Sequence, residues 1–216
     1  LPTLAGSRSG ELALAELREG FPRLGLVLLA GPGNPLTLFR LGRLGVPNLV
    51  LLSVDRLELE LPRAVTRACR RGVAARVASE LGATVPRREL RVVRMALEAV
   101  HKRWSAEDFA AEVGLSRPFL SERLKGAGLP SAGHLLVWVR LLHAGAWLAE
   151  PARSGESVAR QLDYANGSVF RRALRNYTGA TPTEVVARGG LTFVLQCFLE
   201  RHGLRVPAGR RRGSVA

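Results

Sequence analysis

Lysine is almost absent from this strongly basic chain. Its 216 residues include 30 arginines but only two lysines, Lys102 and Lys125, and the formal net charge is +14 at pH 7. A positive charge of this size favours polyanionic partners by long-range attraction. The charge is spread over the whole chain, and an arginine-rich genome would produce the same preference for arginine. Charge alone therefore does not locate a binding site.

Cysteine is also scarce. The two cysteines, Cys69 and Cys197, lie far apart in apolar, helix-like surroundings, where we expect buried, reduced thiols of a cytosolic protein. The four histidines do not cluster with them at metal-ligand spacing. The sequence also lacks a nucleophile elbow and a carboxylate pair at useful spacing. We therefore expect no metal, no cofactor, no catalytic residue and no enzymatic activity.

Long apolar runs are missing too. None reaches the roughly 18–20 residues that span a bilayer, and the amino terminus lacks a basic region followed by an apolar core. We therefore expect a soluble, cytoplasmic protein with no membrane partner. The chain begins at Leu1 rather than at a methionine, and one interpretation is that it is a fragment whose own beginning is missing.

The first 85 residues alternate strand and helix patterns. Residues 24–30 and 48–54 are nearly unbroken apolar runs, and helical patterns follow them at 36–44 and 61–81. Strands that are apolar on both faces are typical of a parallel sheet covered by helices. Two strands are too few for a stable sheet. The segment is therefore either the rear part of a larger α/β domain or a module that pairs with a second copy.

In pattern only, this segment resembles the last third of a response-regulator receiver domain. A receiver that accepts phosphate uses an acidic pocket and a lysine, whereas residues 1–101 contain no lysine and a single aspartate, Asp55. We therefore expect no phosphorelay chemistry. The turn at residues 31–33 lacks the full glycine pattern of a dinucleotide site and the lysine of a P-loop, so we interpret it as a plain turn.

A short helical pattern occurs twice in the second half of the chain. Residues 105–125 and 156–175 each have the pattern of two short helices joined by a tight turn, and Leu120 and Phe170 occupy equivalent positions. Such a helix-turn-helix places its second helix in the DNA major groove. As a helix, residues 132–149 between the copies would be roughly 27 Å long, which approaches the ~34 Å between successive major-groove faces.

Capping residues and amphipathic spacing divide each copy into an inner and an outer face. Ser105 and Asp108 form a near capping box, and Ser116 and Asn166 are expected to cap the two second helices. The residues predicted to point into the core are Phe119, Leu120 and Leu124 in the first copy and Phe170, Leu174 and Tyr177 in the second. The outer faces contain Arg117, Ser121, Glu122 and Lys125, and then Gly167, Ser168, Arg171, Arg172 and Arg175. The alternative for the arginines is a solvated face without a ligand.

Three longer motifs occur in the second half of the chain. They are Ser-x-x-x-Leu-x-x-x-Leu-Lys at 116–125, Arg-Leu-x-x-Ala-x-x-Trp-Leu at 140–148, and Phe-Arg-Arg-Ala-Leu-Arg-Asn-Tyr-Thr-Gly-Ala-Thr-Pro at 170–182. With them, residues from about 90 to 188 resemble the DNA-binding domain of AraC/XylS transcription regulators. The resemblance implies seven helices, two helix-turn-helix units, double-stranded DNA as the ligand and RNA polymerase as a further candidate partner.

The resemblance also implies which residues read bases. They are Arg117, Pro118, Ser121 and Glu122 in the first copy and Gly167, Ser168, Arg171 and Arg172 in the second. Glu122 stands where the family commonly has an arginine; it repels phosphates but can accept a hydrogen bond from cytosine. Asp163 replaces the usual turn glycine, and aspartate tolerates a left-handed backbone better than most residues.

The sequence therefore predicts an α+β protein in three parts. Residues 1–85 are expected to be a small α/β segment with parallel strands, a sensor or dimerisation module that binds a small-molecule effector or a second copy. Residues 86–190 are the double helix-turn-helix domain with its linker helix. Residues 191–216 add an apolar helix, which either packs on the chain or pairs with a partner copy, and a basic tail.

The leading hypothesis for function is a sequence-specific transcription regulator that reads two adjacent major grooves with two recognition helices. The alternative is a ligand-binding or protein-interaction α/β module with a degenerate DNA-binding domain.

Overall fold

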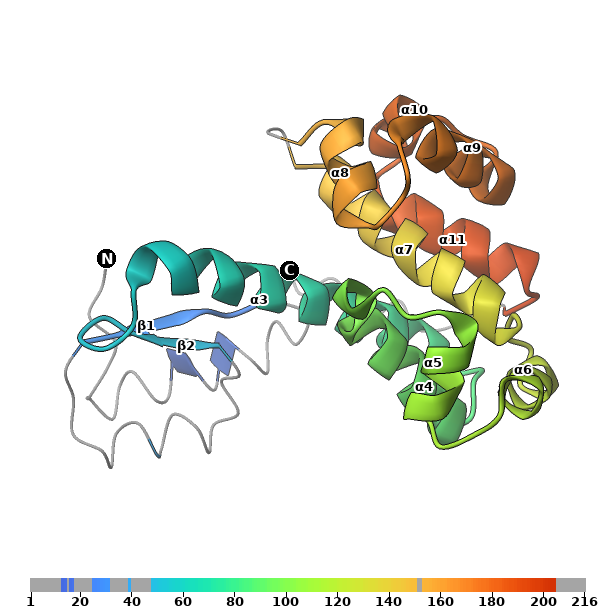
Figure 1. Cartoon of the computed structure of the whole chain (residues 1–216), viewed down its shortest axis with the longest axis horizontal. Coiled ribbons are helices and arrows are strands. Elements are labelled where there is room, and N and C mark those ends of the chain that lie inside the picture. Colours follow the sequence, from blue (N-terminus) through green and yellow to red (C-terminus); the bar gives the residue numbers. More distant parts are fainter. Residues whose placement is uncertain are drawn as a thin grey trace, which may run out of the picture. The chain divides into compact units, whose positions relative to one another are not determined.

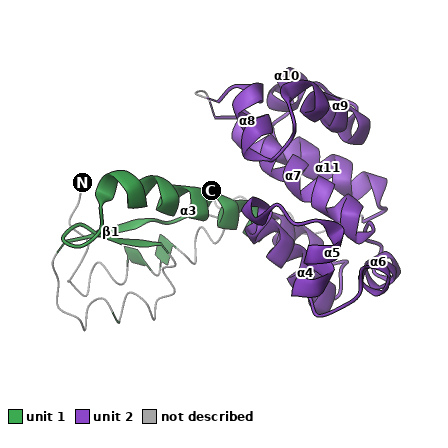
Figure 2. Ribbon diagram, in the orientation of Figure 1, with its two compact units in different colours: residues 1–75 green, residues 76–216 purple. Residues whose placement is uncertain are grey.

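The protein consists of two compact units, residues 1–75 and 76–216 (Figure 2). The structure is a computed structural model, and it describes residues 13–14, 16–17, 25–31, 39, 48–150 and 153–204. The division between the units falls inside helix α3 (Leu57–Leu81), whereas the sequence places a functional boundary after residue 85, which stays a prediction. Of the predicted segments, most of 36–44 and 31–33 and the tail after residue 204 lie outside the described residues.

Unit 1 contains a two-stranded parallel sheet. Strand β1 (Leu28–Ala30) pairs with β2 (Leu49–Leu51) in parallel, with Leu28 opposite Leu49 (Figure 1). The parallel pairing confirms what the apolar runs predicted. The hydrogen-bonded strands are shorter than those runs, because only the last three residues of the first run and three residues near the start of the second form the ladder.

Two close contacts define how the chain runs from the strands to α3. The Asp55 carboxylate accepts a hydrogen bond from the Leu51 amide at 2.8 Å and so closes the turn after β2. A side chain on Gly25 would place its first carbon 2.7 Å from the Ala68 carbonyl oxygen, so glycine lets the chain pass directly against α3. The single aspartate of the first 101 residues therefore has a structural role in a turn.

The expectation of two buried thiols was wrong. Cys69 is exposed, and Cys197 is half-buried. On α3 the buried residues include Ala64 and Ala68, which lie four positions apart, so Cys69 is turned about 100° away from this buried stripe.

Unit 2 is helical, and with the small sheet of unit 1 it gives the α+β class. Its elements are α4 (Arg87–Glu98), the 3₁₀ turn η1 (Val100–Lys102), α5 (Ala106–Glu112), α6 (Arg117–Gly126), α7 (Ala132–Leu148), α8 (Gly155–Gln161), α9 (Gly167–Thr178), α10 (Pro182–Ala187) and α11 (Leu191–Arg201). Among the described residues from 87 to 187 there are seven α-helices, the number that the family resemblance implies. α4 begins directly after Pro86, the first residue of the part that the sequence assigns to the double helix-turn-helix domain.

Helix α7 is the centre of unit 2. It packs against α4, α5 and α6 on one side of the domain and against α8, α10 and α11 on the other. Its core side chains include Trp138, Leu142 and Trp147, and each is at most 2% exposed. His143 is also buried, and its Nε2 lies 2.9 Å from the Leu97 carbonyl oxygen. The linker between the two helical repeats is therefore the common core of both.

Helix α11 packs along α7 and also reaches α9 (Figure 1). Glycine allows the close approach, since a side chain on Gly145 would begin 2.9 Å from the Val194 Cγ2 atom. At its far end, Arg201 donates hydrogen bonds to the carbonyl oxygens of Asn176 and Tyr177, at 3.0 and 3.3 Å. α11 thus stabilises the carboxyl end of α9.

Candidate nucleic-acid interface

The first helix-turn-helix consists of α5 and α6. The capping box at its start is confirmed: the Ser105 hydroxyl accepts from the Asp108 amide at 3.1 Å, and the Asp108 carboxylate accepts from the Ser105 amide at 3.0 Å. The Ser105 hydroxyl also donates to the Asp108 carboxylate at 2.7 Å. This hydrogen bond and the one from the Ser105 amide lower the pKa of Asp108, because both favour the charged carboxylate. Gly114 makes the turn with a φ of 75°. Ser116 stands at the start of α6, but its side chain makes no capping hydrogen bond, contrary to the prediction.

The outer face of α6 includes an aromatic side chain that sequence reasoning assigned to the core. Leu120 and Leu124 are fully buried as predicted, but Phe119 is 60% exposed. Only a narrow stripe of this short helix faces the core, and Phe119 lies about 100° around the helix from Leu120. Phe119 is therefore exposed beside Arg117 and Pro118, which are also exposed.

The second helix-turn-helix consists of α8 and α9. The Ser154 hydroxyl accepts from the Ser157 amide at 3.1 Å, and Asn166 Oδ1 accepts from the Val169 amide at 2.9 Å, so both helices begin with a side-chain cap. Asp163 at the turn has a φ of 63°, as the sequence led us to expect.

The outer face of α9 contains a cluster of arginines. Phe170 and Leu174 are fully buried, which confirms the predicted core, while Tyr177 is half-buried. Ser168, Arg171, Arg172 and Arg175 are exposed, as predicted for the outer face. Gly167 was predicted to lie on the same face but is buried at the start of the helix, because the Glu156 carboxylate lies against it. An Arg171 nitrogen donates to the Ser168 hydroxyl at 3.0 Å.

A groove runs beside these arginines. Its volume is about 720 Å³, and its walls come from three helices. The residues that line it are Arg171, Arg172, Arg175 and Asn176 of α9, Gly155 and Glu156 of α8, and Thr181, Pro182 and Thr183 at the start of α10. Sequence reasoning missed Glu156, Asn176 and the α10 residues as parts of this surface, because no spacing along the chain shows that three helices meet there.

The comparisons with known proteins cover the same part of the chain. Residues 109–188 match a family model described as a helix-turn-helix domain. This segment is an AraC-type helix-turn-helix domain. Domains of this type bind DNA in transcription regulators. A similar solved structure is the crystal structure of a DNA-binding transcriptional dual regulator from Escherichia coli K-12, which is 28% identical over 48% of this chain and 93% of that chain, with a TM-score of 0.42. None of the curated proteins matches.

The two recognition helices of the AraC-type domain differ in charge. On α6, Arg117 pairs with Glu107 at 2.7 Å, Lys125 with Glu122 at 2.9 Å, and Arg123 with Glu89 at 2.8 Å. The sequence of α9 contains three arginines and no acidic residue. The outer face of α6 is therefore close to neutral, whereas that of α9 is strongly positive.

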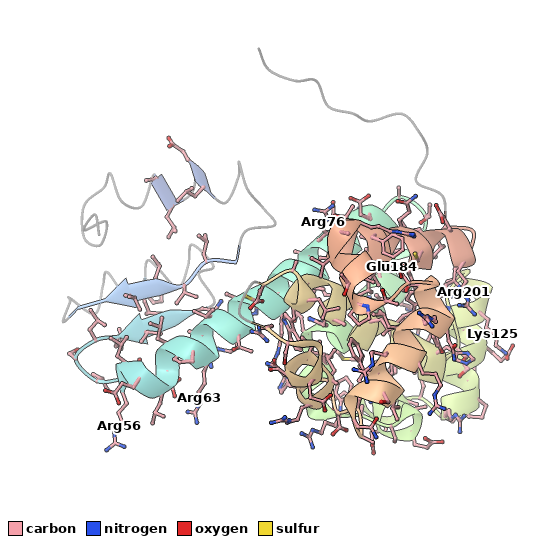
Figure 3. All side chains as sticks on the ribbon, turned by 90° about the horizontal axis from the view of Figure 1, so that it is seen from above. Arg56, Arg63, Arg76, Lys125, Glu184 and Arg201 are labelled. Atoms are coloured by element: carbon pink, nitrogen blue, oxygen red, sulfur yellow. The ribbon has the colours of Figure 1, made fainter. Side chains whose placement is uncertain are left out.

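The predicted base-reading residues of α6 also have contacts within the AraC-type domain. The Ser121 hydroxyl accepts a hydrogen bond at 3.3 Å from the amide of Ala132, the first residue of α7. Lys125 lies at the surface (Figure 3). Hydrogen bonding from Arg117 lowers the pKa of Glu107. Arg117 and Glu122 would have to exchange their present partners for DNA groups in order to read bases.

Neither a membrane-spanning helix nor a metal-binding cluster occurs in the part of the chain that the structure describes. No helix in these residues is long and apolar enough to cross a membrane. No group of three or more histidine, cysteine, aspartate or glutamate side chains among them is placed to hold a metal ion.

Proposed function

We propose that the protein is a sequence-specific transcription regulator whose AraC-type domain reads two adjacent major grooves, one with α6 and one with α9. The observation that carries this proposal is the exposed set Arg171, Arg172 and Arg175 on α9, which lines an open groove. Arginine is the side chain best suited to bidentate hydrogen bonds with guanine and to phosphate contacts.

The proposal divides the work between the two helices. α9 supplies most of the phosphate attraction, because its arginines have no acidic residue on the same helix. α6 contributes base contacts with little net charge, since its cations are paired. The proposed contact residues are Arg117, Pro118, Ser121, Glu122 and Lys125 on α6 and Gly167, Ser168, Arg171, Arg172 and Arg175 on α9.

Helix α7 supports the two-groove reading. Its 17 residues form a rod of about 25 Å, and both helix-turn-helix units pack against it. A buried rod of this kind would hold the two recognition helices at a fixed separation, as reading two successive turns of the duplex requires.

The remaining parts of the proposal concern partners. Residues 1–85 serve as a sensor or dimerisation module that binds a small-molecule effector or a second copy. RNA polymerase is the further partner, and the protein acts in the cytoplasm. The proposal assigns no catalytic role.

The test is selection of bound sequences from a random pool of duplex DNA with the full chain. The expected result is enrichment of a site with two half-sites whose centres lie roughly 10–10.5 base pairs apart. Enrichment of a single half-site would remove α6 from the proposal. A pool without enrichment would contradict sequence-specific binding.

The second candidate function is protein interaction with a degenerate DNA-binding domain. The observation in its favour is the pairing of every cation on α6 with a carboxylate. It predicts DNA binding that is weak and equal on all sequences, so the same selection experiment separates the two functions.

A further inference from the structure

The first position of the second recognition helix has no side chain, and a carboxylate from another helix occupies the space. A Cβ atom built on Gly167 would collide with the Oε2 atom of Glu156 and lie 3.2 Å from the Arg171 Nη1 atom. The Glu156 carboxylate and the Arg171 guanidinium thus both lie close to the point where a first side chain of α9 would begin. Because glycine has no side chain, the Glu156 carboxylate can occupy this space.

Glu156 belongs to the same groove as the arginines of α9. It lies in the first turn of α8, is exposed, and lines the groove together with Arg171 and Arg172. The amino end of α9 is electrostatically favourable for a carboxylate, because the free amides and the helix dipole are positive there. Towards DNA the same carboxylate is unfavourable, since it repels phosphates. A negative charge on a surface otherwise suited to phosphates suggests a role in selectivity rather than in affinity.

We propose that Glu156 is a base-reading residue that takes the place of the missing side chain at position 167. Its carboxylate accepts a hydrogen bond from the N4 amino group of a cytosine, while Arg171 beside it donates to a guanine O6 or N7 atom. Both pairings are the ones that the donors and acceptors of the major groove favour. This inference rests on the proposed function, because it needs α9 in the major groove.

The proposal predicts opposite effects on cognate and random DNA. With Glu156→Ala, the preference for cytosine at one base pair of the α9 half-site falls on the order of tenfold, while the affinity for random DNA rises because a negative charge is removed. With Glu156→Gln, the preference at that base pair shifts towards adenine, since an amide pairs with adenine N6 and N7. A residue with only a structural role would lower binding to both DNA types together.

A steric variant provides an independent test. Gly167→Ala displaces the Glu156 carboxylate and is expected to change the base preference at the same base pair. The double variant Glu156→Ala/Gly167→Ala is expected to show the same base preference as Glu156→Ala alone. The matched control is Gly133→Ala, because Gly133 lies in α7 outside the groove and a Cβ atom there meets only the Ala106 Cβ atom at an ordinary contact distance of 3.8 Å. Thermal unfolding of each full-length variant shows whether it remains folded.

The experiment is the selection described above, repeated with each full-length variant, followed by affinity measurements on the selected and on random duplexes. If the unaltered protein selects a site and Glu156→Ala keeps the same base preference, the inference is overturned and the proposed function stands. Equal losses on selected and random DNA would also overturn it. If the unaltered protein selects no sequence, the proposed function fails, and this inference fails with it.

Discussion

Arg172 is exposed on α9 between two further arginines of the same groove, and the sequence of α9 contains no acidic residue. At the scale of single residues, the attraction of a helix to DNA depends more on whether its cations are already paired than on how many cations it has. Arg117 and Lys125 on α6 are exposed as well, but each is already paired with a carboxylate. The outer faces of the two recognition helices therefore differ in the number of unpaired cations that they offer to DNA.

The first prediction follows from Arg172. Arg172→Ala is expected to weaken binding to the selected site by about 1–3 kcal/mol, the value of a bidentate arginine–guanine contact. Binding can be measured by fluorescence anisotropy on selected and random duplexes. Arg91→Ala is a suitable control, because it removes the same charge from the exposed face of α4, outside residues 109–188. An equal loss on both duplexes would leave Arg172 with a phosphate contact only.

A second prediction concerns Glu89, a nearly buried carboxylate whose pKa is lowered, first of all by the hydrogen bond from Arg123. A lowered folded-state pKa means that the pair stabilises the protein fully above the unfolded pKa of about 4.3 and that this stabilisation disappears as pH falls through the folded value. At pH 7, Glu89→Gln is expected to reduce the free energy of unfolding by about 1–3 kcal/mol.

Urea titrations of both proteins between pH 7 and pH 3 would check the second prediction. The difference in unfolding free energy should shrink at the acidic end, because protonation of Glu89 removes the same interaction. A difference that is constant with pH would show that the stabilisation does not come from the charge of Glu89.

At the scale of elements, the two recognition helices begin differently. The side chain of Asn166 caps α9 at 2.9 Å, whereas Ser116 makes no capping hydrogen bond to α6. Asn166→Ala is therefore expected to lower the free energy of unfolding by about 1 kcal/mol, and Ser116→Ala by clearly less. Chemical denaturation measures both. Equal losses of unfolding free energy in the two variants would show that the capping hydrogen bond of Asn166 does not stabilise α9.

The elements were largely predictable from the sequence. The caps at Ser105 and Asn166, the buried pairs such as Leu120 with Leu124, and the left-handed turn at Asp163 are all local signals within a few residues. The exposure of Phe119 was not predictable, because a large apolar residue beside a narrow buried stripe has the same local sequence pattern whether or not a neighbouring helix covers it. The groove beside α9 was not predictable either, since it depends on how three helices meet.

At the scale of the whole molecule, only part of the net charge of +14 is free to contact DNA phosphates, because some cations are already paired with carboxylates. On random duplex DNA, where the arginines of α9 make phosphate contacts instead of guanine contacts, replacing Arg171, Arg172 and Arg175 together by glutamine is expected to reduce the slope of log affinity against log salt concentration by about three, one for each phosphate that is no longer neutralised. Replacing Arg117 and Lys125 should change the slope much less, because their charges are already paired. Titrations of the full-length variants at several salt concentrations measure this. Equal reductions per residue would contradict the division of work between α6 and α9.

Arg201, which is labelled in Figure 3, donates hydrogen bonds to the last carbonyl groups of α9, and these bonds have a practical consequence. Arg201 lies thirteen residues beyond Arg188, where the family match ends. A fragment cut at the family boundary would keep every residue that is proposed to touch DNA, but it would be without the cation that neutralises the negative end of the second recognition helix. We therefore expect that the smallest independently working DNA-binding piece of this chain includes α11.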